Sequence, residues 1–256
     1  MVEQKGVIIN KKKKYENKFI DIHNHLLPWL DDGSKSLEQT ENMLKIAYKE
    51  GVRTIIVTPH FKGENDYNFY NHVEDVLETV KSNLNDYTSQ ITLKLGCEIF
   101  YSHDCLHLLN EKIIPTMADS RYILVEFFPM ADYQYIRNAV QELLFGGYYP
   151  ILAHIERYHN IIKDMNQVKR LIDMGSYIQV NAMSIEGKAG FSIYRATNAL
   201  LKNDLVHFVA TDAHSEFTRA PKIKQCSKYL TRKFGKSYMQ KLLLENPNKI
   251  LKNEYL

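Results

Sequence analysis

Two pairs of residues in the sequence have types and spacing that suit the binding of a metal ion. His23 and His25 stand two positions apart in the segment DIHNH, and Asp212 and His214 repeat that spacing in ATDAH. On an extended backbone, residues i and i+2 point the same way, so each pair can clamp one ion. The two pairs therefore predict a metal site to which two distant segments contribute.

Both pairs follow short apolar runs that are expected to be strands, and similar residues follow the other runs. In a parallel barrel the C-terminal ends of the strands meet at one rim, where chemistry gathers. A single histidine or glutamate at a strand end is more often structural, but the full set on one rim indicates a site. The residues that follow the seven expected strands are His23 with His25, His60, Glu98, Glu126, His154, Asn181, and Asp212 with His214.

This set contains imidazoles and carboxylates and no thiolate cluster, which favours Zn, Mn or Fe over an iron–sulfur centre. It has too many ligands for one ion, so two or three ions that share a bridging carboxylate fit better. Such a cluster can supply hydroxide near neutral pH and neutralise charge on a phosphoryl group. The segment Asp31-Asp32-Gly33 leaves two interpretations open: an Asx-type turn that leads into a helix, or a further ligand from the same rim.

Seven short apolar runs must supply this rim. They recur roughly every 30 residues, the length of a strand–helix–strand unit. Most are rich in β-branched and aromatic residues, as buried parallel strands are. The runs are 19–22, 54–57, 92–95, 122–125, 149–152, 177–180 and 206–209.

The segments between the runs carry helix signals. Ser36, with Gln39 three positions later, resembles a capping box, and Gly51 stands where a C-terminal cap is expected. Later helices are expected over 67–86, 132–145, 164–173, 190–202 and 221–233, and further helix, interrupted near Pro247, over 237–251. Seven strand–helix units without a linker indicate one barrel-like domain.

The composition excludes several classes of protein. The chain has 256 residues, 45% hydrophobic and 25% charged, which is ordinary for a globular protein. A net charge of +3 is too balanced to predict binding to nucleic acid. No apolar run approaches the ~18 residues of a membrane span, so no stable membrane insertion is expected. Three cysteines without disulfide spacing favour a reducing, cytoplasmic setting.

The first 18 residues are expected to form a leader outside the fold. Lys11 to Lys14 form a block of like charges with no apolar periodicity. Such blocks are usually solvated tails, and less often arms that dock an acidic partner.

The blocks DIHNHLLPWLDDGSKSLEQ, VTPHF, LGCEIFY, LVEF, LAHIERY and TDAHSEFTRAP together resemble the polymerase and histidinol phosphatase (PHP) superfamily. Within it, the sequence is most similar to the manganese-dependent protein tyrosine phosphatases of bacterial capsule and exopolysaccharide loci. The resemblance begins at residue 19 and covers almost all of the remaining chain, so it places the barrel at 19–256. It implies a distorted TIM-like (β/α)7 barrel of the PHP type that hydrolyses a phosphate monoester by metal-activated water, without a phospho-enzyme.

The resemblance also implies individual roles around two to three Mn²⁺ ions, with Fe or Zn as alternatives. Asp32 is preferred to Asp31 because it directly precedes the glycine of the DDG block. Three ligand groups follow: His23, His25, Glu98 and Asp212 for one ion; Glu98, Glu126 and His154 for a second; and Asp32, His60 and His214 for a third. Arg157 and Arg219 would bind the substrate phosphate, to which guanidinium offers paired donors.

The implied partner is a phosphorylated, tyrosine-rich tail of a tyrosine kinase that regulates capsule synthesis. A small monoester such as histidinol phosphate is the alternative substrate. A non-catalytic, metal-stabilised regulatory barrel is a third hypothesis, which the full ligand set disfavours. Tyr133, Tyr135 and the loop Tyr67–Tyr70 are candidates to line the site, or core residues at helix starts.

A competing phosphatase motif, Cys-x5-Arg, spans Cys226 to Arg232. That motif must be a loop whose N–H groups surround a phosphate, but this segment has no glycine. Because Ile223, Cys226 and Leu230 fall on one face of a helix, we interpret Cys226 as a core residue. Cys97, beside Glu98, receives the same interpretation.

Overall fold

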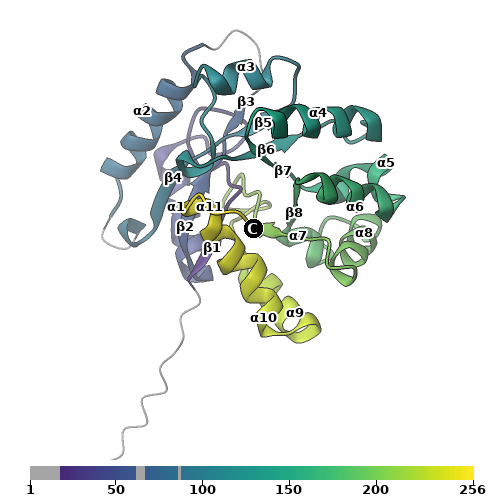
Figure 1. The fold of residues 1–256 in the computed structure, drawn as a ribbon. Coiled ribbons are helices and arrows are strands. Elements are labelled where there is room, and N and C mark those ends of the chain that lie inside the picture. Colours follow the sequence, from purple (N-terminus) through teal and green to yellow (C-terminus); the bar gives the residue numbers. More distant parts are fainter. Residues whose placement is uncertain (1–17, 62–66, 86–87) are drawn as a thin grey trace, which may run out of the picture.

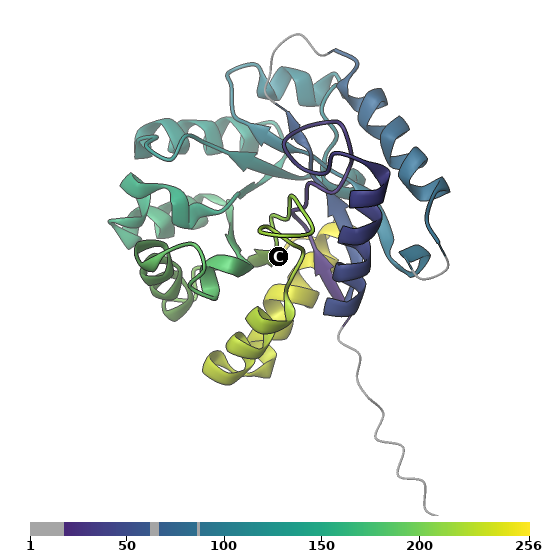
Figure 2. The ribbon, with the colours of Figure 1, turned by 180° about the vertical axis from the view of Figure 1, so that it is seen from behind.

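The computed structural model describes residues 18–61, 67–85 and 88–256. Residues 1–17 of the expected leader lie outside these ranges. In the described part, parallel strands curl around a common core and helices cover the outside (Figures 1 and 2). The predicted fold class, a distorted α/β barrel, is confirmed, and each of the seven predicted runs contributes a strand. No helix among the described residues is long and apolar enough to cross a bilayer.

The strands form two sheets. The first has the order β1-β2-β4 and the second the order β3-β5-β6-β7-β8-β9, with every pairing parallel. The strands are β1 Phe19–Asp21, β2 Val52–Val57, β3 His60–Phe61, β4 Thr92–Leu95, β5 Glu98–Phe100, β6 Tyr122–Glu126, β7 Tyr149–Leu152, β8 Tyr177–Asn181 and β9 Phe208–Ala210.

Strands β2 and β4 each break and resume two residues later as β3 and β5, which the sequence did not predict. Thr58 and Pro59 separate β2 from β3, and Gly96 and Cys97 separate β4 from β5. A side chain at Gly96 would approach Ile56 to 2.7 Å, so this break needs a glycine. The resumed strands, β3 and β5, belong to the second sheet. His60 and Glu98 are the first residues of these strands and are register partners.

The first and last strands are joined beyond their own ends. Asn24 forms a parallel bridge with Ala213. The His25 N–H donates to the Ala213 carbonyl at 2.8 Å, and the Asp212 N–H donates to the His23 carbonyl at 2.9 Å. The segments that close the barrel are therefore the two that carry the predicted ligand pairs.

A buried carboxylate supports this closure from below. Asp21 is fully buried, accepts the Thr211 N–H at 2.9 Å and accepts the Asn24 side-chain amide at 2.8 Å. Burial raises the pKa of Asp21 in spite of these hydrogen bonds. In the sequence, the position of Asp21 within the apolar strand β1 is the feature that indicates this structural role.

The helices follow the predicted order, with shorter ends in several cases. Ser36 caps α1 by accepting the Gln39 N–H at 3.1 Å, and Gly51 ends it with φ 94°, as predicted. The longer helices are α1 Leu37–Glu50, α2 Phe69–Ser82, α4 Tyr133–Phe145, α6 Met165–Met174, α8 Phe191–Lys202 and α9 Lys224–Phe234. The prediction of 67–86 for α2 was too long at both ends.

Three short helices were missed because one turn shows no apolar periodicity: α3 Cys105–Asn110, α5 His159–Ile162 and α7 Ala182–Ile185. At the C-terminus, α10 Lys236–Gln240 continues through a π turn, η4 Lys241–Glu245, into α11 Asn246–Leu251. The predicted interruption is this wider turn, followed by Pro247 in the first turn of α11, where proline is tolerated. The remaining short turns are η1 Thr88–Gln90, η2 Met117–Asp119 and η3 Ile155–Arg157.

The C-terminal helix covers the end of the barrel opposite the ligand rim. Ile250 of α11 is fully buried in one cluster with the inward-facing residues Ile20, Tyr122 and Phe208. Figure 1 shows α11 across the middle of the view, over the strands.

The substitution Ile250→Ala should therefore destabilise the whole barrel. Deleting a buried Ile side chain in this way costs about 2–5 kcal/mol, measured as the free energy of unfolding in denaturant. Lys252→Ala, an exposed position just after the same helix, is the control and should change it by less than about 0.5 kcal/mol. Equal stabilities of the two variants would show that α11 is not part of the core.

Candidate metal centre

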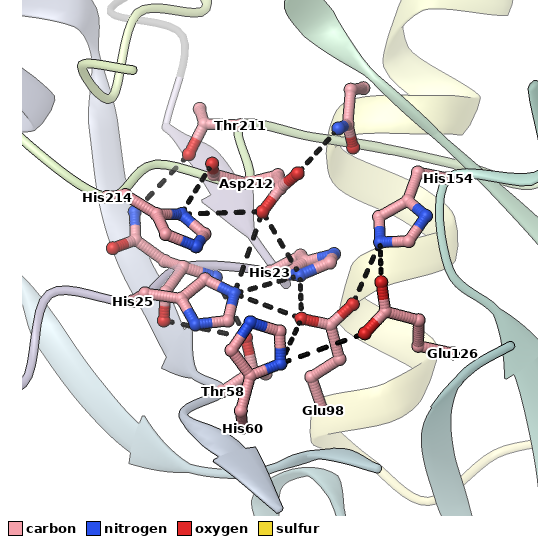
Figure 3. Close-up of polar contacts among 12 residues, drawn as sticks. His23, His25, Thr58, His60, Glu98, Glu126, His154, Thr211, Asp212 and His214 are labelled. Carbon is pink, nitrogen blue, oxygen red and sulfur yellow. Dashed lines mark hydrogen bonds and ion pairs between the residues drawn. The ribbon is translucent and has the colours of Figure 1, made fainter. Parts of the chain in front are cut away.

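The two ligand pairs meet on Glu98. The Nε2 atoms of His23 and His25 lie 3.1 Å apart, and both face the same carboxylate oxygen, Glu98 Oε2, at 3.0 and 3.1 Å. Asp212 Oδ1 lies 3.5 Å from the first of these nitrogens and 3.6 Å from the second. This is the four-residue group expected for a first ion (Figure 3).

A second group forms on the other oxygen of Glu98. His154 Nε2 lies 2.9 Å from Glu98 Oε1 and 3.4 Å from Glu126 Oε1. The three side chains expected for a second ion are therefore adjacent. His154 has φ 33°, a left-handed conformation that is uncommon for a residue other than glycine.

The third group lies beside the first. Asp32 Oδ1 is 3.4 Å from His60 Nε2 and 3.5 Å from His214 Nε2. The ring of His25 packs against that of His214 with centroids 3.9 Å apart, so His25 borders this group as well. The other nitrogen of His60, Nδ1, faces Glu98 Oε2 at 3.2 Å and Glu126 at 3.8 Å. His60 therefore lies between two groups, which the sequence analysis did not anticipate.

Three of the histidines direct Nε2 inward because Nδ1 has a fixed acceptor. His25 Nδ1 donates to Asp31 Oδ2 at 2.8 Å, and His214 Nδ1 faces the Asp212 carbonyl at 3.1 Å. His23 Nδ1 faces Gln179 Oε1 at 3.3 Å. A proton held on Nδ1 leaves the lone pair on Nε2, as a metal ligand requires.

The chemistry of this donor set fits divalent cations. His23, Glu98 and Asp212 are at most 2% exposed, and burying several carboxylates together is costly without a counter-charge. Glu98 Oε2 has no hydrogen-bond partner among the described residues, although three imidazole nitrogens approach it. Ligand atoms about 2.1 Å from a shared ion lie roughly 3–3.5 Å from one another, which is the spacing of these atoms.

The charges in the cluster shift one another's pKa values. Burial opposes ionisation of Glu98, but His23 and His154 outweigh it and hold its pKa well below the usual range. Burial and the nearby Glu98 charge raise the pKa of Glu126. Burial and the neighbouring His25 lower the pKa of His214 to about 3. Glu98 is therefore ionised at neutral pH and His214 neutral, the states in which each can bind a cation.

Asp31 and Asp32, which the residues alone did not separate, have different positions. Asp31 is turned away from the cluster: besides His25, it accepts the N–H groups of Gly33 at 2.8 Å and His60 at 3.0 Å. Asp32 is mostly exposed and faces the third group. A side chain at Gly33 would collide with the His25 carbonyl at 2.0 Å, which explains the glycine after the two aspartates.

Gln179 is a supporting residue that the sequence analysis missed. Its Oε1 accepts the His154 N–H at 2.8 Å and faces His23, while its amide donates to Asn181 Oδ1 at 2.8 Å. Asn181 in turn donates to Asp212 Oδ2 at 2.7 Å. One fully buried glutamine thus links two ligand groups. A polar side chain within the largely apolar strand β8 was the feature of the sequence that could have indicated this role.

The two arginines expected to bind phosphate border the cluster. Arg157 Nη2 lies 2.9 Å from Asp212 Oδ2, and Arg219 Nη2 lies 2.7 Å from Asp212 Oδ1. Both side chains are about one-third exposed, so their remaining donors are accessible at the rim.

The other candidate residues lie elsewhere. Cys226 is buried on α9, and Cys97 is buried with its thiol on the Pro59 carbonyl. Tyr133 and Tyr135 pack against the hydrophobic core, as does Tyr70. These three tyrosines follow the interpretation as core residues, whereas Tyr67, of the same loop as Tyr70, is 72% exposed and does not belong to the core.

Comparisons with known proteins agree on one family. Residues 19–252 match the family described as Capsular polysaccharide synthesis, CpsB/CapC. The tyrosine-protein phosphatase CpsB of Streptococcus pneumoniae is 34% identical over 243 residues, which cover 93% of this chain and 100% of that protein. The putative tyrosine-protein phosphatase CapC of Staphylococcus aureus is 34% identical over 238 residues, 92% of each chain.

A solved structure gives the same result. It comes from crystal structures of YwqE from Bacillus subtilis and CpsB from Streptococcus pneumoniae, described as metal-dependent tyrosine phosphatases. It superposes on this chain with a TM-score of 0.82 at 28% sequence identity, covering 92% of this chain and 95% of the other.

The different positions of the two aspartates predict different effects of substitution. Asp31→Asn should weaken metal binding about 10- to 100-fold without changing the number of ions, because Asp31 orients His25 and is not itself a proposed ligand. Asp32→Asn should remove one ion. Chelator competition and elemental analysis measure both, and Asp75→Asn, exposed on α2, is the control. Loss of an ion in Asp31→Asn and not in Asp32→Asn would reverse the assignment.

Proposed function

This chain belongs to the CpsB/CapC family of capsular polysaccharide synthesis proteins, and we propose that it hydrolyses phosphotyrosine on a tyrosine kinase that regulates capsule or exopolysaccharide synthesis. It is a metal-dependent tyrosine-protein phosphatase. The observation that carries this function is the convergence of buried imidazole and carboxylate groups on Glu98, with two arginines at the same opening.

The ligands of the proposed cluster are nine side chains, and Mn²⁺ is the proposed ion, with two to three per chain. Glu98 would belong to two of the ion sites, because its two oxygens face different ligand groups. The ligands are His23, His25, Asp32, His60, Glu98, Glu126, His154, Asp212 and His214. When bound, such ions lower the pKa of water and neutralise charge on a phosphoryl group.

The protein's own groups position the substrate. Arg157 and Arg219 approach the cluster from two loops and present planar, paired donors to phosphate oxygens. Asp212 fixes both guanidinium groups, and Asn181 holds Asp212 from behind. The inner ligands are almost fully buried, whereas both arginine side chains are about one-third exposed.

The location and the extent of the catalytic unit are part of the same proposal. The three cysteines are free and buried, which supports a reducing, cytoplasmic setting where a kinase tail would be accessible. We propose residues 19–256 as the phosphatase domain; residues 1–17, most of the expected leader, lie outside the described residues.

Chelation should abolish hydrolysis of a phosphotyrosyl peptide, since the proposed chemistry needs the bound ions. Adding Mn²⁺ should restore it, and elemental analysis of the restored protein should give two to three ions per chain. Activity that persists in excess chelator, with no ion left in the protein, would contradict a metal-dependent mechanism.

Arg219→Ala should lower kcat/KM about 10- to 100-fold, because a hydrogen bond to a charged group contributes about 1.5–3 kcal/mol. Metal content should stay the same. Arg232→Ala is the matched control: Arg232 is exposed on α9 and belongs to the Cys-x5-Arg motif. A loss of activity in Arg232→Ala, with Arg219→Ala unaffected, would favour the cysteine mechanism.

A further inference from the structure

Large aromatic side chains are exposed on the loops that surround the centre. Trp29, Phe128 and Phe217 are 57%, 64% and 75% exposed, although burial of such large apolar rings is favourable. Each lies two or three positions from a proposed ligand: Trp29 precedes Asp32, Phe128 follows Glu126, and Phe217 follows His214. Exposed apolar groups gathered at a polar site mark a binding surface.

Phe128 contacts a further ring, Phe100, that follows the ligand Glu98 on β5. Phe100 is the register partner of Glu126 in the β5–β6 pair, and Glu98 precedes it by two positions on the same strand. Since alternate residues of a strand share a face, Phe100 points to the same side as both glutamates. The Phe128 ring packs edge-to-face against Phe100, with centroids 4.6 Å apart at 83°.

The other two rings stand at the tips of turns whose ends lie in the centre. The loop with Trp29 is closed by hydrogen bonds from Ser34 N to the His25 carbonyl at 3.0 Å and from Trp29 N to the Ser34 carbonyl at 3.2 Å. The loop with Phe217 is closed by His214 N and Ser215 N, which both donate to the Arg219 carbonyl. In Figure 2 the loops after β1 and β9 both lie over the middle of the barrel.

Trp29 also has a strained backbone. Its φ of 70° lies in the left-handed region, which is unfavourable for a bulky residue. Strain of this kind persists where the surrounding loop imposes it, and this loop runs from the ligand His25 to the ligand Asp32.

We propose that Trp29, Phe100, Phe128 and Phe217 form an aromatic collar that binds the phenyl ring of the phosphotyrosine while its phosphate enters the metal centre. This inference rests on the proposed function. A flat apolar ring attached to a phosphate matches a rim that carries both exposed aromatic side chains and the two arginines, Arg157 and Arg219. Rings stacked edge-to-face or offset attract one another beyond simple burial, so the collar selects an aryl phosphate over inorganic phosphate or an alkyl ester.

The test compares a ligand that has a ring with one that has none. The ring-bearing substrate is a heptapeptide of Gly and Ser with one central phosphotyrosine, and the ring-free ligand is inorganic phosphate as a competitive inhibitor. Both are measured on the Mn²⁺-loaded full chain. The triple variant Trp29→Ala/Phe128→Ala/Phe217→Ala should raise KM for the peptide at least ~10-fold, while the inhibition constant of phosphate changes less than about 2-fold.

Phe145→Ala provides the matched control. Phe145 is 83% exposed at the far end of α4, about 20 Å of helix away from the loop that carries Phe128. It should change neither constant. An unchanged KM in the triple variant would overturn the collar. Equal increases in KM and in the phosphate constant would also overturn it, because the loops would then shape the phosphate site and not bind the ring.

Fluorescence tests the contact directly, because Trp29 is the only tryptophan in the chain. Titration of the Mn²⁺-loaded protein with the same heptapeptide carrying a non-hydrolysable phosphonate should give a saturable change in Trp29 emission. Emission that stays constant at saturating inhibitor would overturn the contact. If the wild-type protein fails to hydrolyse the phosphotyrosyl peptide at all, the proposed function itself is wrong, a result distinct from an active enzyme that tolerates loss of the collar.

Discussion

The parallel pairing of residues 23–25 with residues 212–213 is the constraint on which the rest of this structure depends. Two backbone hydrogen bonds and one bridge join segments almost two hundred positions apart. The same residues supply His23, His25, Asp212 and, one position further, His214. Closure of the barrel and assembly of the two ligand pairs therefore depend on the same backbone contacts.

Outside the ligands, a layer of polar side chains determines which atoms face inward. Asp31 binds His25 and Gln179 faces His23, so each imidazole has its proton on the outer nitrogen. Asp21 holds the closure segments from below. These groups are buried and charged or amide-bearing, and they are stable there because their donors and acceptors are paired. The cluster is therefore preorganised by hydrogen bonds and not by the ions alone.

Between the buried cluster and the solvent, the rim changes in character from charged to aromatic. Asp212 pairs with both arginines, and in the proposed collar Phe100 at the end of β5 and rings from three loops border the opening. A polar centre with an apolar border suits a substrate that has a dianion at one end and a ring next to it. In this proposal the strand ends hold the metal ligands, and Phe100 with the loops after β1, β6 and β9 recognises the ring.

The chain itself indicated the order of strands and helices and eight of the nine candidate ligands, whereas the choice of Asp32 over Asp31 came from the family resemblance. Period-two spacing, apolar runs and residues at strand ends are local properties, so they can be read without coordinates; the cap at Ser36 is another. Only the tertiary structure decided that Asp31 orients while Asp32 faces the cluster, that His60 lies between two groups, and that Gln179 links two of them. The structure also shows that Tyr133 and Tyr135 pack against the core, whereas Trp29 and Phe217 are exposed on loops next to the candidate ligands. The reason is physical: side-chain direction and cross-chain contact follow from barrel register and loop closure, and no neighbouring residue in the sequence specifies either.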